Sequence, residues 1–129
     1  MSLELETTRD RSGARTVKVR GRLDTHSYGE FDARMKPELE ADERTLVLDL
    51  AGLDYISSAG IRSIFAARKQ MAQRGGQLLV VNAQPQVRKV FEIVRAVPVS
   101  EIFSSVAELD AYLDAMQRKA KAAEDDDGF

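Results

Sequence analysis

The stretch that decides the fold is residues 46–64, with the sequence LVLDLAGLDYISSAGIRSI. Residues 45–50 are short, β-branched and almost wholly apolar, which is typical of a central strand buried on both faces. From Ser58 onward an apolar stripe with helical spacing predicts an amphipathic helix over 58–74, ended by two glycines. The turn at 54–57 therefore joins a central strand to a helix that begins near Ser58.

Similar patterns predict the other elements. Alternating apolar and polar residues indicate two strands, at 3–8 and 16–20, joined by a hairpin loop, and Gly21 ends the second strand. Another buried strand covers 77–81. Helices are predicted at 28–39, where Pro37 should kink or interrupt the helix, from 85 to 94, and from 105 to 116, with Ser105 and Glu108 as a capping box.

This order of elements predicts an α/β domain with a mixed sheet, an antiparallel edge hairpin followed by parallel strands. The chain has 129 residues, which fits one domain. We expect residues 1–118 to form that domain. Residues 119–129 have no apolar face and carry a run of acids, so we expect them to form a disordered acidic tail.

The composition argues against several functional classes. The net charge is −2, which does not favour a nucleic-acid binder. The sequence has no signal peptide and no apolar run long enough to cross a membrane, so we expect a cytoplasmic protein without membrane insertion. It has no cysteine, and its one histidine, His26, has no second His or Cys nearby. We therefore expect neither a metal nor a cofactor.

Two serines stand where the central strand passes into the helix. The first turn of a helix has unpaired backbone N–H groups and a partial positive charge, so it accepts a capping oxygen or an anion such as phosphate. Ser57 or Ser58 is therefore a helix cap, a phosphate-binding group or a phosphorylated residue. Gly60 allows the backbone or a partner to approach closely.

Three segments in this order resemble the STAS domain family, which contains anti-sigma factor antagonists and the C-terminal domains of sulfate transporters. They are GRLDTHSYGEFDARM at 21–35, the stretch at 46–64, and GGQLLVVNAQPQVRKVFEIV at 75–94. The resemblance covers roughly residues 3–117. It implies a mixed sheet with about four helices, mostly on one face, and a regulatory role without catalysis.

The resemblance also implies a partner switch that regulates transcription. In this family an unphosphorylated antagonist binds an anti-sigma factor that is also a serine kinase; phosphorylation ends the binding and a serine phosphatase restores it. Aligning on Gly60 puts Ala59 at the usual acceptor position, so Ser58, Ser57 or neither takes the phosphate. We expect a monomer or weak dimer, with a partner surface formed by Asp24, Ser57, Ser58, Ala59, Gly60 and Arg62.

Other interpretations remain open. Asp24 matches the acid of the family's G-x-L-D turn, and it equally fits a cap for the helix near Ser27. A STAS domain without phosphorylation serves as a scaffold or as an accessory subunit of a transport or signalling complex. Nucleotide binding is neither supported nor excluded. Ser58, His26 and Asp24 have the residue types of a catalytic triad, but the sequence lacks the nucleophile elbow G-x-S-x-G. We therefore do not expect an enzyme.

Overall fold

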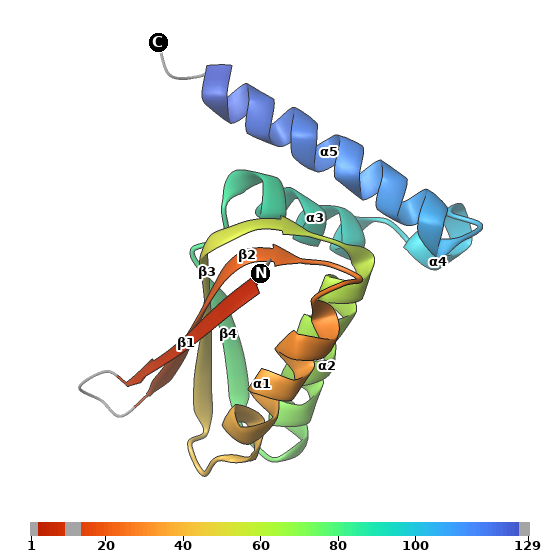
Figure 1. Ribbon diagram of the computed structural model, residues 1–129. Coiled ribbons are helices and arrows are strands. Elements are labelled where there is room, and N and C mark those ends of the chain that lie inside the picture. The colour runs from red at the N-terminus through yellow and green to blue at the C-terminus, as the bar shows by residue number, and fades with distance from the viewer. Residues whose placement is uncertain (1–2, 10–13, 127–129) are drawn as a thin grey trace.

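A four-stranded mixed sheet forms the centre of the computed structural model, which describes residues 3–9 and 14–126 (Figure 1). The strand order is β1-β2-β3-β4; β1 and β2 are antiparallel, and β2–β3 and β3–β4 are parallel. The predicted mixed sheet with its edge hairpin is thereby confirmed, and the hairpin loop lies outside the described residues. The strands are β1 (Leu3–Arg9), β2 (Arg15–Leu23), β3 (Thr45–Ile56) and β4 (Gln77–Val81).

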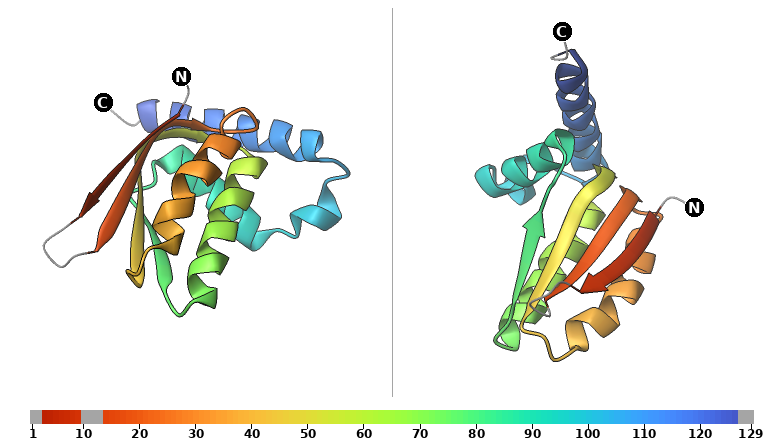
Figure 2. Two further views of the ribbon diagram at one scale, coloured as in Figure 1. Left: turned by 60° about the horizontal axis from the view of Figure 1, so that its bottom comes forward. Right: turned by 90° about the vertical axis from the view of Figure 1, so that its left-hand side faces the viewer.

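Two groups of helices surround this sheet. The first two helices lie side by side on one face, behind the sheet in the right-hand view of Figure 2. The third and fifth pack against each other at the end of the sheet, where β3 bends over. The helices are α1 (Tyr28–Glu40), α2 (Ser58–Gln73), α3 (Pro85–Ala96), the single turn α4 (Val99–Ile102) and α5 (Val106–Asp126).

The central strand β3 differs from its prediction in length and in burial. It runs to Ile56 rather than ending at 50, because its second half pairs with the end of β2. Only Ser57 therefore separates strand from helix, instead of a turn over 54–57. The strand is also buried on one face only: Leu46 and Leu48 are buried, whereas Val47 between them is half-buried.

Gly21 does not end β2, contrary to the prediction. It has a φ of 101° and lies at an irregularity in the β2–β3 register, after which pairing resumes up to Leu23 and Ile56. Glycine adopts this left-handed conformation without steric cost, so the strand bends at a bulge and continues. The extra pairs bring the end of β2 against the start of α2.

Helix α1 is not interrupted at Pro37, and helix α5 continues past its predicted end. Pro37 lies inside the uninterrupted helix α1, because Phe31, Met35 and Leu39 of this helix are buried against the core and outweigh one lost backbone hydrogen bond. Helix α5 includes residues up to Asp126, beyond the expected boundary at 118. The division into a domain and an acidic tail stays a prediction, and residues 127–129 lie outside the described part.

Gly60 sits where the first turn of α2 meets the ends of β2 and β3. A Cβ built on it would lie 2.8 Å from the carbonyl oxygen of Leu23 and 2.8 Å from side-chain carbons of Leu23 and Ile56. The expected close approach is thus made by the chain's own strand. No side chain fits at this position without moving backbone or core.

We expect Gly60→Ala to lower the free energy of unfolding by about 1–3 kcal/mol, the usual effect of overpacking. Urea denaturation measures the change. Gly29→Ala is the matched control, because Gly29 lies in α1 with nothing within 4 Å of its added Cβ. This control should stabilise the helix by about 0.5–1 kcal/mol. Equal effects of the two substitutions would contradict the close contact at Gly60.

Candidate functional site

Ser57 caps helix α2. Its Oγ accepts a hydrogen bond from the Gly60 N–H (3.3 Å), and its own N–H donates to the Leu23 carbonyl (2.9 Å). Only 3% of the residue is exposed. The capping role that the sequence left open between two serines is therefore filled by Ser57.

Ser58 is the first residue of α2 and its hydroxyl faces inward. Its N–H donates to Oδ1 of Asp110 at 2.8 Å. Its Oγ is buried and has no hydrogen-bond partner among residues 3–9 and 14–126. The serine at the start of the helix thus has an unsatisfied hydroxyl next to a carboxylate that already occupies the helix terminus.

Helix α5 is fastened to this turn by a second contact. The Gln117 side chain accepts a hydrogen bond from the Ile56 N–H (3.0 Å) and donates to the Ile56 carbonyl (2.8 Å) and to that of Leu113 (3.3 Å). Gln117 is 3% exposed. Asp110 and Gln117 together hold α5 across the end of β3 and the beginning of α2.

Asp24 organises the turn that leads into α1. Its Oδ1 accepts hydrogen bonds from the His26 N–H (2.9 Å) and the Ser27 Oγ (3.2 Å). Ser27, the N-cap of α1, makes no side-chain cap bond. The Asp24 carbonyl also accepts the Tyr28 N–H at 2.9 Å, so Asp24 caps the turn that leads into α1, and its second oxygen lies 3.5 Å from Nε of Arg22.

Tyr55 lies among the charged groups of this region. The Arg22 guanidinium stacks 4.0 Å from the centre of its ring. Burial raises the pKa of the Tyr55 phenol, and the carboxylates of Asp114, Asp110 and Asp24 raise it further. Residues from β2, β3 and α5 thus converge beside the Ser57–Ser58 turn.

An apolar groove of about 520 Å³ opens beside Ser58. Arg62, one turn along α2, is exposed and lines it with Phe65. The opposite wall comes from α3, α4 and the start of α5, including the cap Ser105. The Ser105 Oγ accepts the Glu108 N–H at 3.1 Å, which is half of the predicted capping box; the Glu108 carboxylate accepts the Ser104 N–H and hydroxyl instead. The structure thus places Ser58 and Arg62 on one groove, while Ala59 and Gly60 are buried behind it.

Sequence reasoning missed the contribution of α5 to the site. Asp110 and Gln117 were not singled out, because the predicted stripe of this helix consisted of apolar residues alone. A polar residue next to that stripe, as Gln117 is next to Met116, was the available signal for a buried hydrogen bond.

Two other features concern the part of the chain that the structure describes. No group of three or more His, Cys, Asp or Glu side chains there is arranged to hold a metal ion. None of its helices combines the length and the apolar character needed to cross a membrane.

Comparison with known proteins places these features in a family. The model of the STAS domain matches residues 6–109. A Bordetella bronchiseptica protein named as an anti-sigma factor antagonist, BtrV, is 39% identical over 75 residues, which are 58% of this chain and 65% of that protein. The matched segment thus spans slightly less than two thirds of this relative's length.

Solved structures show the same fold. An anti-sigma factor antagonist from Mycobacterium paratuberculosis matches with a TM-score of 0.66 and 21% identity, over 90% of this chain and 95% of that chain. The unphosphorylated anti-sigma factor antagonist SpoIIAA matches with a TM-score of 0.57 and 18% identity, over 70% and 83%. At these identities the likeness concerns the fold alone.

The contact between Asp110 and the start of α2 predicts a loss of stability on mutation. Asp110→Ala leaves the Ser58 N–H without its acceptor and should lower the free energy of unfolding by about 0.5–2 kcal/mol. Asp114→Ala is the control, because its exposed pair with Arg118 is worth less than about 1 kcal/mol. Chemical denaturation of both variants checks this. A larger loss for Asp114→Ala would contradict it.

The surroundings of Tyr55 predict a pH dependence. Its pKa is raised from the ordinary 10.0, so folding favours the neutral phenol. This contribution to stability is full below pH 10 and is lost as the pH rises through the higher folded-state pKa. Absorbance at 295 nm, titrated for the protein and for Tyr55→Phe, should give a difference curve with its midpoint above 10. A midpoint below 10 would contradict the assignment.

Proposed function

The chain belongs to the STAS domain family, and from this premise we propose that it is an anti-sigma factor antagonist in a partner-switching pathway. Its partners are an anti-sigma factor that acts as a serine kinase and a phosphatase that reverses the modification. It catalyses no reaction itself. We place it in the cytoplasm as a monomer or weak dimer, bound to neither nucleic acid nor membrane.

The observation that carries this proposal is the position of Ser58. It is the first residue of α2, and its N–H meets the Asp110 carboxylate at 2.8 Å. A phosphate adds about −1.5 to −2 charges, which a helix N-terminus tolerates. Here the phosphate has to share that terminus with Asp110. Phosphorylation therefore repels the start of α5 and disturbs the groove next to Ser58, while the strands and α2 remain folded.

Between the two serines we favour Ser58 as the modified residue. The Ser57 hydroxyl already accepts the Gly60 N–H and caps the helix, so modifying it removes a fold-stabilising bond. The Ser58 hydroxyl makes no such bond within the described residues. Because it is buried, a kinase reaches it only when the contact between Asp110 and α2 opens.

The partner surface we propose is the groove beside Ser58. Arg62 and Phe65 offer charge and apolar area on α2, and Ile102 and Val106, which are 57% and 54% exposed, extend the apolar surface to α4 and α5. Asp24 lies in the neighbouring loop and contributes negative charge. Binding of the partner therefore requires α5 to stay in place, and the charge at Ser58 acts on binding through the position of α5.

A second candidate is a scaffold that is never phosphorylated. It is favoured by Ala59 at the family's usual acceptor position and by the burial of the Ser58 hydroxyl. Such a protein would hold a complex together through the same groove, without a kinase or phosphatase.

The test uses Ser58→Ala, Ser58→Asp and the anti-sigma factor captured with this protein from its native cells. Ser58→Ala should keep binding and abolish phosphate uptake from ATP, followed by mass spectrometry. Ser58→Asp should weaken binding by about 2–5 kcal/mol, because it buries a charge at the interface. Gln70→Asp is the charge control, since Gln70 is an exposed residue of the same helix and does not line the groove.

Two outcomes decide against the proposal as stated. Full phosphorylation of Ser58→Ala transfers the role to Ser57 or to another residue. A Ser58→Asp protein that loses thermal stability but keeps its affinity marks a purely structural serine, and the scaffold is then the better description.

A further inference from the structure

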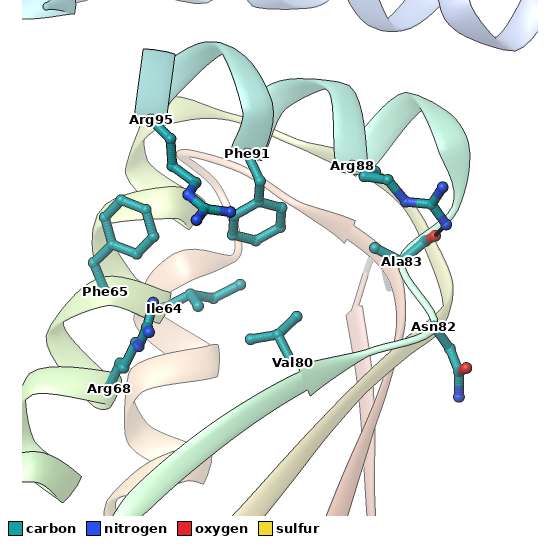
Figure 3. Close-up of a pocket in the computed structure, with 9 residues that line it drawn as sticks. All are labelled: Ile64, Phe65, Arg68, Val80, Asn82, Ala83, Arg88, Phe91 and Arg95. Atoms are coloured by element: carbon teal, nitrogen blue, oxygen red, sulfur yellow. Dashed lines mark hydrogen bonds between the residues drawn. The ribbon is translucent and has the colours of Figure 1, made fainter. Parts of the chain in front are cut away.

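A second pocket lies between α2, α3 and the carboxyl end of β4, and neither Ser57 nor Ser58 lines it (Figure 3). Its volume is about 360 Å³. Ile64 and Val80 are among its apolar lining residues. The rings of Phe65 and Phe91 flank it with their centroids 6.3 Å apart and their planes inclined by 52°. The pocket therefore has an apolar interior with two aromatic rings.

Three arginines surround this apolar interior. Arg88 donates to the Ala83 carbonyl at 3.2 Å. The side chains of Arg68 and Arg95 have no ion pair or hydrogen bond with any residue in 3–9 or 14–126. Figure 3 shows the Arg95 guanidinium pointing toward the space between the two phenylalanine rings. Two positive charges thus face the pocket without a counter-charge.

The pocket belongs to a positively charged part of an otherwise slightly acidic chain. The chain has a net charge of −2, yet α2 contains no acid and α3 contains one, Glu92. Charge complementarity thus favours a negatively charged occupant. The cations on these two helices are Arg62, Arg68, Lys69, Arg88, Lys89 and Arg95.

The shape of the pocket favours a protein segment over a small ligand. Sites for small molecules enclose most of their ligand. Here Phe65 is 36% exposed and all three arginines are exposed. The pocket therefore accepts one large side chain of a protein segment, and the residues on either side of that side chain contact the rim of the pocket. β4 is an edge strand, and its Val80, which lines the pocket, is 37% exposed and gives an extended segment further apolar surface. Arginine and aromatic residues around a small pocket are typical of protein interfaces.

We propose that this pocket docks an acidic segment of a partner protein. An aromatic side chain of that segment enters the pocket over Ile64 and Val80 and packs beside the Phe65–Phe91 pair, and carboxylates on either side of it pair with Arg68 and Arg95. Phe65 also lines the groove beside Ser58, so the two surfaces adjoin. The docking site works without phosphorylation and stands whether or not the switch at Ser58 exists.

The probe is a fluorescent seven-residue peptide with a central phenylalanine and three acids on each side. Two matched peptides carry the corresponding amides in place of the acids, or alanine in place of phenylalanine. Titrated into the full chain at low salt, the acidic peptide should bind at least about tenfold more tightly than either control peptide. Backbone NMR shifts should map its binding to Phe65, Arg68, Phe91 and Arg95.

Paired charge reversals test the pocket itself. Arg68→Glu with Arg95→Glu should abolish binding. Lys69→Glu with Lys89→Glu makes the same charge change on the same helices outside the pocket lining and should weaken binding less than about threefold. Circular dichroism confirms that both variants fold, which is expected because all four side chains are exposed.

Three results would overturn the proposal. Equal losses of peptide affinity in the two double variants would mean that the peptide is attracted to the overall positive charge of the two helices and not to this pocket. Equal binding of the phenylalanine and alanine peptides means that no side chain enters the pocket. Tighter binding of a single-stranded oligothymidylate, lost in the Arg68→Glu, Arg95→Glu variant, assigns the surface to a nucleic acid instead.

Discussion

The structure depends on how the backbone N–H and carbonyl groups at the buried end of β3 find hydrogen-bond partners. Ile56 is the last residue of the central strand and is fully buried, so its backbone groups need partners inside the protein. Gln117 supplies both, with one side-chain amide bonded to the Ile56 N–H and carbonyl. Breaking such a buried pair would cost about 1–3 kcal/mol. This requirement holds α5 over the strand end, and the contact of Asp110 with Ser58 and the α5 wall of the groove follow from the position of α5.

Fastening α5 at Gln117 brings Asp110 of the same helix to the start of α2. A carboxylate at a helix N-terminus is favourable, but the terminus has limited room for negative charge. In the proposed switch, a phosphate on Ser58 would therefore compete with Asp110 for the same backbone N–H groups. The competition connects a local charge to the position of a whole helix, which is the physical requirement for a switch that alters a docking surface without unfolding the domain.

The two pockets on either side of Phe65 differ in chemistry. The groove beside Ser58 is largely apolar and includes the start of α5, so a change at Ser58 alters its shape. The pocket between α2, α3 and β4 is rimmed by arginines and has no wall from α5. Movement of α5 would thus act on the first directly and on the second only through α3, which packs against α5. A partner that used both would stay tethered while the first contact was released.

The sequence by itself determined whatever depends on neighbours along the chain. The edge hairpin, the strand at Gln77–Val81, the start of α2 at Ser58 and the Ser105 cap follow from local periodicity and capping. Only the tertiary structure decided the length of β3, the continuity of α1 through Pro37 and the burial of the Ser58 hydroxyl. Those depend on pairing between distant residues, such as Gln117 with Ile56 across 61 positions, and no local pattern encodes such a contact.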